Sequence, residues 1–344
     1  MFDLLSTPPL PHPIPNPAEA ASPDLPLLLI GHGSRDVEGR QAFLELAQTY
    51  QALTPHRPVI PCFLELTGPS IAQGVEQCLA QGWQELVALP VLLFGARHNK
   101  FDVTLELDRL QALHPQLRIH YGGPLGIRVE ILQLLRDRLT ALVAAQPRGI
   151  PAAETVLLFV GRGSSDPEAN AETCKLARLL WEGSGYRAVE TCFIGITHPR
   201  LPLGFERALS WQPRRIILLP YFLFTGVLVK KIEAALQEQQ QLHPEIDWLS
   251  LPELGIVDPV LQSLRHLEQE ARHGQTQMNC HLCKFRLAVS AQDSVPLTAG
   301  IQNGHSHHHH YSHGHSHSHH SHHSASPDPY GQPEDYHQRA WQVP

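Results

Sequence analysis

The sequence has 344 residues, of which 42% are hydrophobic and 17% are charged. At roughly 100–200 residues per domain, this length predicts two globular domains and excludes a single small module. The formal net charge is −7 and no basic stripe stands out, so we expect no nucleic-acid partner. No apolar run approaches the roughly 18 residues of a membrane span, and residues 1–26 lack the features of a signal peptide. We therefore expect a soluble, cytoplasmic protein with no membrane partner.

The chain begins with a proline-rich segment and then changes character. Residues 1–26 contain eight prolines and no sustained periodicity, which predicts a flexible leader. From Leu27 onward, short apolar runs alternate with stretches of helical periodicity, a pattern typical of βαβ units on a parallel sheet. The strands expected first are 27–30, 59–64, 86–92 and 118–121, and the helices lie near 37–53, 69–81, 100–113 and 126–145.

An internal repeat organises the rest of the chain. Residues 31–36 (GHGSRD) recur as 161–166 (GRGSSD), and 125–127 recur as 254–256, at offsets of 130 and 129. The sequence therefore predicts an α/β protein with two tandem domains, each with a mainly parallel four-stranded sheet flanked by helices. The expected ranges are 27–146 for the first domain, 154–272 for a degenerate second domain and 273–344 for a tail.

The two copies differ at three positions that carry chemistry. The first copy has His32, Glu65 and His98 where the second has Arg162, Gly195 and Leu228. Two copies of one scaffold share their packing residues, whereas a chemical function can survive in one copy alone. This asymmetry indicates that the first domain holds the active site.

The three residues follow the first three expected strands, so they should meet at the carboxyl edge of the sheet, where open α/β sheets bind ligands. Two imidazoles and one carboxylate suit a transition ion such as Co, Fe, Ni or Zn, and leave coordination positions open for exchange. Glu65 has two simpler explanations, because it could cap a helix or pair with an arginine. The pattern nevertheless predicts a metal site made of His32, Glu65 and His98.

Residues around this site favour an anionic ligand. The backbone N–H groups of Gly33 and Ser34 lie at the start of an expected helix, where they can receive an anion. Arg35, Arg97 and Lys100 add positive charge beside the two histidines. We expect these five residues to bind a ligand that carries several carboxylates.

Three segments resemble a known family: residues 28–35 (LLIGHGSR), 63–65 (FLE) and 90–98 (PVLLFGARH). They are similar to the sirohydrochlorin chelatases of the CbiX type, in the class II chelatase superfamily, over roughly residues 26–285. The resemblance, which is to the long form with two fused flavodoxin-like domains, implies a lyase that inserts cobalt or ferrous iron into sirohydrochlorin, without a nucleotide. It implies that His32 and His98 hold the metal and that Glu65 acts as ligand or proton acceptor.

The resemblance implies one leading function and leaves two alternatives open. The leading expectation is a cobaltochelatase of cobalamin biosynthesis, and the same ligands would suit a ferrochelatase of sirohaem synthesis. A metal-storage protein or metallochaperone without a catalytic cleft is the alternative from another class. The second domain is expected to close the cleft, with Arg162, Lys230 and Lys231 available to substrate carboxylates. The protein is expected to be a monomer or a homodimer.

A cysteine pair follows the second copy of the repeat, in the sequence Met278-Asn-Cys280-His-Leu-Cys283. Some long members of the family carry a similar Met-x-Cys-x-x-Cys segment associated with an iron–sulfur cluster. A four-iron cluster normally needs four thiolates, so two chains would have to share one or other ligands would have to complete it. A zinc site, a redox dithiol or an idle pair are the other interpretations.

A histidine-rich tract lies in the tail, where twelve of the nineteen residues from 305 to 323 are histidine. An expression tag would usually be an unbroken terminal run, whereas this tract is interrupted and the chain continues beyond it to Pro344. Such a density of imidazoles predicts a storage or delivery arm for divalent ions. Its histidines are His305, His307, His308, His309, His310, His313, His315, His317, His319, His320, His322 and His323.

Overall fold

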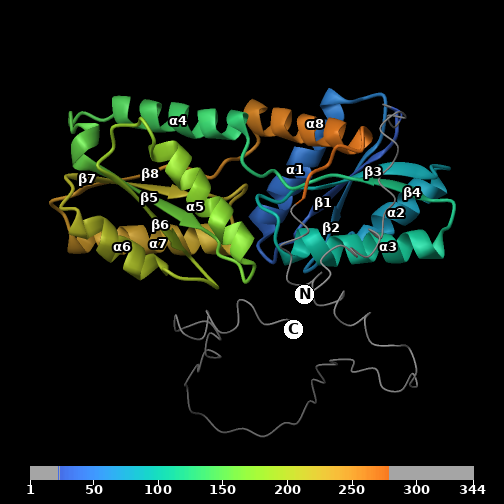
Figure 1. Cartoon of the computed structure of the whole chain (residues 1–344), viewed down its shortest axis with the longest axis horizontal. Coiled ribbons are helices and arrows are strands. Elements are labelled where there is room, and N and C mark those ends of the chain that lie inside the picture. The colour runs from blue at the N-terminus through green and yellow to red at the C-terminus, as the bar shows by residue number, and fades with distance from the viewer. Residues whose placement is uncertain (1–21, 23, 279–344) are drawn as a thin grey trace, which may run out of the picture.

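The computed structural model describes residue 22 and residues 24–278 of the chain. They form two four-stranded sheets in tandem, each flanked by helices (Figure 1). The first half contains β1 (Leu27–Gly31), α1 (Val37–Leu53), β2 (Val59–Phe63), α2 (Ile71–Ala80), β3 (Glu85–Pro90), the π-helical turn η1 (His98–Asp102), α3 (Val103–Leu113), β4 (Arg118–Tyr121) and α4 (Val129–Ala144). The second half contains η2 (Ala152–Glu154), β5 (Thr155–Gly161), α5 (Pro167–Trp181), β6 (Ala188–Phe193), α6 (Leu201–Ser210), β7 (Arg215–Pro220), α7 (Val227–Leu242), β8 (Asp247–Ser250) and α8 (Asp258–Arg272).

The two sheets have the same topology. Their strand orders are β2-β1-β3-β4 and β6-β5-β7-β8, and every pair of neighbouring strands is parallel. The register repeats as well, because Ile30 lies opposite Cys62 and their counterparts in the second copy, Val160 and Cys192, lie opposite each other. The predicted α/β fold class and the tandem repeat are confirmed.

The central strands explain why the chain folds in this way. Strands β1 and β5 are buried along their whole length, as expected for apolar strands covered by helices on both faces. Helices α1 and α5 start at Asp36 and Asp166, whose side chains accept hydrogen bonds from backbone N–H groups of the first turn. The repeated glycine-rich segments 31–36 and 161–166 connect β1 to α1 and β5 to α5.

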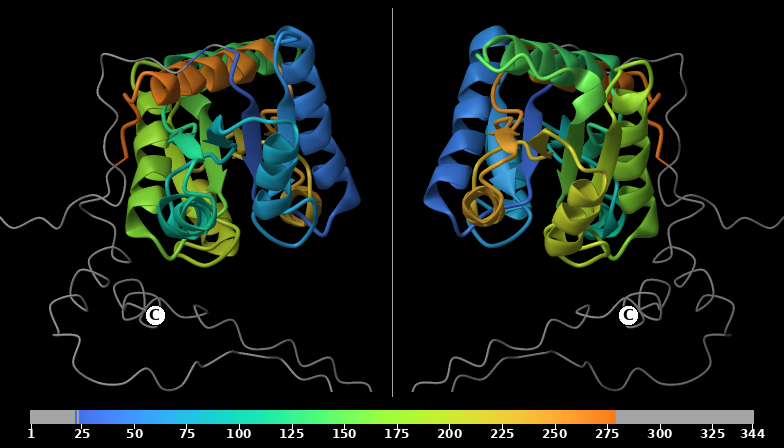
Figure 2. Two further views of the ribbon diagram at one scale, coloured as in Figure 1. Left: turned by 90° about the vertical axis from the view of Figure 1, so that its right-hand side faces the viewer. Right: turned by 90° about the vertical axis from the view of Figure 1, so that its left-hand side faces the viewer.

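The last helix of each half packs against the other half of the molecule. Helix α8 contacts β3 and β4 of the first half, and α4 contacts α5 of the second half. The two helices also contact each other and lie together along one side of the molecule (Figure 2). One large hydrophobic core consequently joins the two halves, while a smaller core lies on the far face of each sheet.

A buried polar cluster attaches α8 to the first half. The carboxylate of Glu268 accepts hydrogen bonds from Arg57, Arg272 and the hydroxyl of Tyr50, at 2.5–2.8 Å. All four residues are buried. Because a buried charge must be paired, this cluster specifies where α8 docks.

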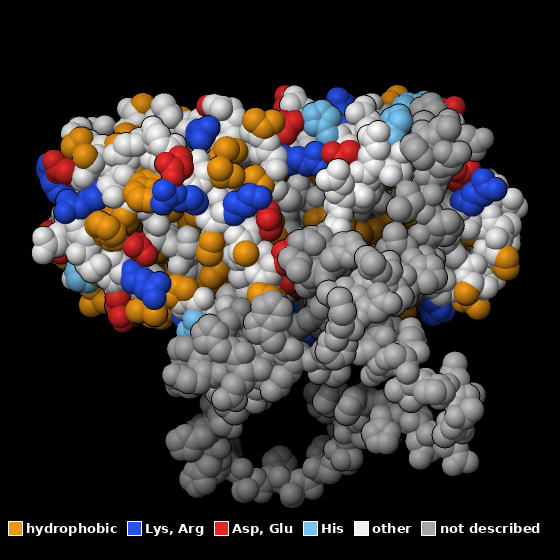
Figure 3. Space-filling model, viewed as in Figure 1, with side chains coloured by type: hydrophobic (Ala, Val, Ile, Leu, Met, Phe, Trp, Pro, Cys, Tyr) orange, Lys and Arg blue, Asp and Glu red, His pale blue; other side chains and the backbone are white. Residues whose placement is uncertain are grey.

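The outer surface of the described residues is mixed in charge. On the face shown in Figure 3, basic and acidic side chains are interspersed rather than gathered into a stripe. None of the helices in residues 24–278 combines the length and the apolar character needed to cross a membrane.

Candidate metal-binding site

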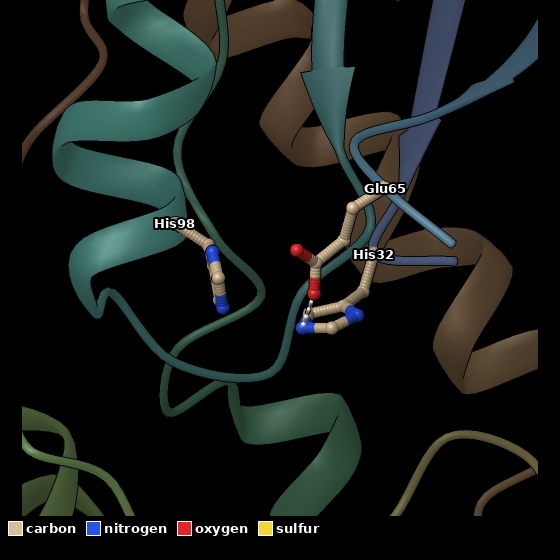
Figure 4. Close-up of side chains that lie close together, drawn as sticks. All are labelled: His32, Glu65 and His98. Carbon is tan, nitrogen blue, oxygen red and sulfur yellow. Dashed lines mark ion pairs between the residues drawn. The ribbon is translucent and has the colours of Figure 1, made fainter. Parts of the chain in front are cut away.

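The structure brings His32, Glu65 and His98 together at the carboxyl edge of the first sheet. They follow β1, β2 and β3, and each offers a ligand atom within 4.8 Å of the other two (Figure 4). The Nε2 atom of His32 lies 3.5 Å from Oε1 of Glu65. The two imidazole rings stand edge to face with their centres 4.6 Å apart. Separations of this size allow one ion to be reached by all three side chains after small rotations.

Gly33 is what allows the loop of His32 to approach Glu65. Its φ is +99°, a conformation that side chains rarely adopt. A Cβ at this position would lie 1.8 Å from the backbone oxygen of Glu65. Gly33 is therefore required by the close packing of the two loops.

The environment of His32 keeps its imidazole neutral. Burial lowers the pKa of His32 to about 4, with further lowering by electrostatic interaction with Arg162 and His98, while Gly33 and Glu65 oppose the change. Its Nε2 atom is buried and has no hydrogen-bond partner among the described residues. A neutral imidazole with an unused nitrogen that faces a histidine and a carboxylate fits a metal ligand.

Asp102 orients the second histidine. Its Oδ2 lies 2.9 Å from Nδ1 of His98, and its Oδ1 accepts a hydrogen bond of 3.3 Å from Nε of Arg97. A carboxylate on Nδ1 fixes the ring and leaves Nε2 for a metal, an arrangement common around metal-binding histidines. Sequence reasoning missed Asp102, although its position four residues after His98 on a helical segment was a usable signal.

The backbone around His98 forms a π-helical turn, η1, rather than the α-helical start expected near residue 100. Such turns are rare and are frequent at functional sites. Asn99 within the turn is fully buried, and its backbone oxygen and side-chain oxygen accept hydrogen bonds from the hydroxyl of Tyr121. Its amide also donates to Sδ of Met278, so the end of the described chain lies against this turn.

The site opens into a cleft lined by both halves. His32, Gly33, Ser34, Arg35, Arg97 and His98 line it from the first half, and Arg162 and Tyr221 are among the lining residues from the second. The guanidinium of Arg162 is close enough to His32 to lower the pKa of that imidazole, and its own pKa is lowered by burial. Arg162 occupies the position in the second half that His32 occupies in the first. Its positive charge therefore lies close to the triad of the first half.

The lysines have environments different from those expected. The side chain of Lys100 is buried and pairs with Asp166 and Glu168 of the second half, so it does not line the cleft. Lys230 pairs with Asp36 and, like the exposed Lys231 on α7, lies outside the cleft lining. Their positive charges are therefore not directed at a ligand in the cleft.

Two predicted groups fall outside the described residues. Cys280 and Cys283 lie there, as does the histidine tract 305–323, so the cluster and the storage arm stay predictions. Of the cysteines in the described part, Cys62, Cys78 and Cys192 are buried and Cys174 is exposed.

The CbiX family model matches residues 26–142 and again residues 156–271, which are the two copies of the repeat. The chain belongs to the CbiX family. The resemblance seen in the three sequence motifs is confirmed, including the two-repeat form.

Relatives of this family member include proteins named for two metals. It is 35% identical to a sirohydrochlorin cobaltochelatase of Priestia megaterium, over 76% of this chain and 85% of that one. It is 32% identical to a sirohydrochlorin ferrochelatase of the same organism, over 70% and 88%. Among solved structures, SirB from Bacillus subtilis with Fe³⁺ is similar, with a TM-score of 0.62, 28% identity and coverage of 72% of this chain and 96% of that one.

Proposed function

We propose that this protein is a sirohydrochlorin chelatase that inserts Co²⁺ into the tetrapyrrole. The observation that carries the proposal is the convergence of His32, Glu65 and His98 on one point, where the two histidines line a cleft shared by both halves. Membership of the CbiX family, with a cobaltochelatase relative at 35% identity, supports the substrate.

In this proposal the metal ion is a substrate that must be held and then released. His32 and His98 supply neutral nitrogen ligands, and three protein ligands in all leave positions open for the incoming ring nitrogens. Weak, open coordination suits an ion that is to be passed on. Glu65 is 46% exposed and His32 and His98 line the cleft, so a ring in the cleft can approach the three donors.

Metal insertion also requires removal of two pyrrole N–H protons. Glu65 is the exposed carboxylate of the triad, so it can accept the first proton, release it to solvent and accept the second while the histidines keep hold of the ion. We assign Glu65 this role, in addition to ligation before the ring arrives.

The cleft walls suit a flat ring with acidic substituents. Arg35, Arg97 and Arg162 line the cleft and can meet carboxylates at its periphery. Phe94 and the buried Tyr221 provide an apolar wall, with ring centres 5.4 Å apart. The binding contribution of the second half is therefore a wall and a cation rather than a second metal site.

Cobalt is assigned over iron on the dithiol segment and the histidine tract, together with the cobaltochelatase relative. Ferrous iron suits the same three donors, and a ferrochelatase is a relative at 32% identity. Parallel assays of purified protein with sirohydrochlorin and Co²⁺ or Fe²⁺, without oxygen, test the assignment. We expect the tetrapyrrole absorption to shift far faster than in the protein-free mixture, and faster with Co²⁺ than with Fe²⁺.

The alternative of a metal-storage protein gives the opposite result. Storage predicts binding of several ions per chain through the histidine tract and no acceleration of insertion. An insertion rate equal to that of the protein-free mixture, with both metals, would favour storage and overturn the proposed chelatase function.

A further inference from the structure

Lys100 connects the turn that carries His98 to the other half of the molecule. It lies two residues after His98 within η1, and only 3% of its side chain is exposed. Its Nζ atom donates a hydrogen bond of 3.0 Å to Oδ2 of Asp166 and a second to Glu168. Both carboxylates belong to the start of α5, so a buried cation of the first half is neutralised entirely by the second.

The repeat supplies a second copy of this arrangement. Lys230, the counterpart of Lys100 in the second half, donates to Asp36 at 2.9 Å and to Glu38 at 3.0 Å. Asp36 and Glu38 are in turn the counterparts of Asp166 and Glu168. The two halves are thus joined by two clamps of identical composition, each made of a lysine and two carboxylates at the start of the opposite helix.

The clamps differ in burial and in what lies beside them. Lys230 is 45% exposed and follows Leu228, which has replaced the histidine, whereas Lys100 is buried and follows His98. An exposed ion pair is screened by water and contributes little, but a buried cation that loses its partners is strongly unfavourable.

We propose that Lys100 is a positioning residue, which uses the carboxylates of Asp166 and Glu168 to hold η1 so that His98 faces His32 and Glu65. The inference rests on the proposed function, since it concerns the placement of a metal ligand. Asn99 and Asp102 fix the same turn from within the first half, and Lys100 is fixed from across the boundary between the halves. The second half, which has lost the three donors, thereby still determines the geometry of the metal site.

The two clamps provide a matched pair of variants in the full chain, Lys100→Met and Lys230→Met. Each removes one cation and leaves two carboxylates at the start of a helix. We expect the Co²⁺ concentration that gives half-maximal insertion to rise about tenfold or more in Lys100→Met, and to stay within about twofold of wild type in Lys230→Met. The visible absorption of bound Co²⁺ that is lost in His98→Ala should weaken in the first variant alone.

Glu168→Gln covers the case in which Lys100→Met does not fold. It keeps the pair between Lys100 and Asp166, so a smaller increase in half-maximal Co²⁺ is expected, with Glu38→Gln as the control. The positioning role would be overturned if Lys100→Met needed no more Co²⁺ than Lys230→Met and Glu168→Gln needed no more than Glu38→Gln. It would also be overturned if Lys100→Met had a lower melting temperature but the Co²⁺ dependence of wild type. If wild type itself shows no His98-dependent Co²⁺ absorption and no insertion, the proposed function fails and the inference fails with it.

Discussion

Replacement of Asp102 by Asn tests whether the carboxylate behind His98 tunes the metal site. Asp102 accepts from Nδ1 of His98 at 2.9 Å, and the substitution keeps the shape of the side chain while it removes the charge. Loss of such an outer partner typically weakens metal affinity about 10–100-fold. The side chains of His98 and Asp102 are 31% and 25% exposed, so water screens the pair and we expect the lower end, about tenfold or roughly 1.4 kcal/mol.

The assay is the Co²⁺ dependence of sirohydrochlorin metallation, with the melting temperature measured alongside. Glu106→Gln is the control, since it removes a carboxylate from the next turn of the same helical segment, where Glu106 pairs with Arg109 on the surface. Asp102→Asn should need about ten times more Co²⁺ with little change in melting temperature, because a partly exposed pair contributes little to folding. An unchanged Co²⁺ requirement in Asp102→Asn, equal to that of Glu106→Gln, would refute the orienting role.

Three further outcomes are expected. Arg162→Gln removes a cation that lowers the pKa of His32, so the pKa of His32 should rise by less than the shift that burial causes. On acidification, Co²⁺ binding should then be lost at a higher pH than in wild type. An unchanged pH of half-maximal Co²⁺ binding would contradict this. Glu268→Gln disrupts the buried cluster under α8 and should lower the free energy of unfolding by about 3 kcal/mol in urea titrations, and a loss below about 1 kcal/mol would show that the charge is dispensable. Deletion of residues 303–325 should slow insertion when Co²⁺ is scarce and not when it is saturating, whereas loss at saturating Co²⁺ would give the tract another role.

Most of the fold could be predicted because the two copies of the repeat are recognisable in the sequence. The expected strands near 27–30 and 118–121 match β1 and β4, and the offset between the two copies reappears in the strand register. The convergence of His32, Glu65 and His98 followed from their positions after three neighbouring parallel strands. These features depend on local periodicity and on the rule that parallel strands end at one edge.

The rest depends on contacts between the halves, which a linear pattern does not encode. The apolar faces of α4 and α8 predict burial but not which sheet each will cover. Lys100 looked like a cation for the ligand, because nothing near it in the sequence indicated Asp166 as its partner. Asn99 in the π-helical turn His98–Asp102 likewise bonds to Tyr121 on β4, a contact that the local sequence pattern does not indicate.

The central claim is that the triad of the first half holds the ion that is passed to the ring, and one rate tests it most directly. The measurement is the initial rate of Co²⁺ insertion into sirohydrochlorin at saturating metal by His98→Ala, in protein shown by circular dichroism to be folded. We expect a fall to the rate of the protein-free mixture, because His98 is one of three converging donors and the described residues offer no other such group. Insertion at the wild-type rate would place the chemistry elsewhere and contradict the account.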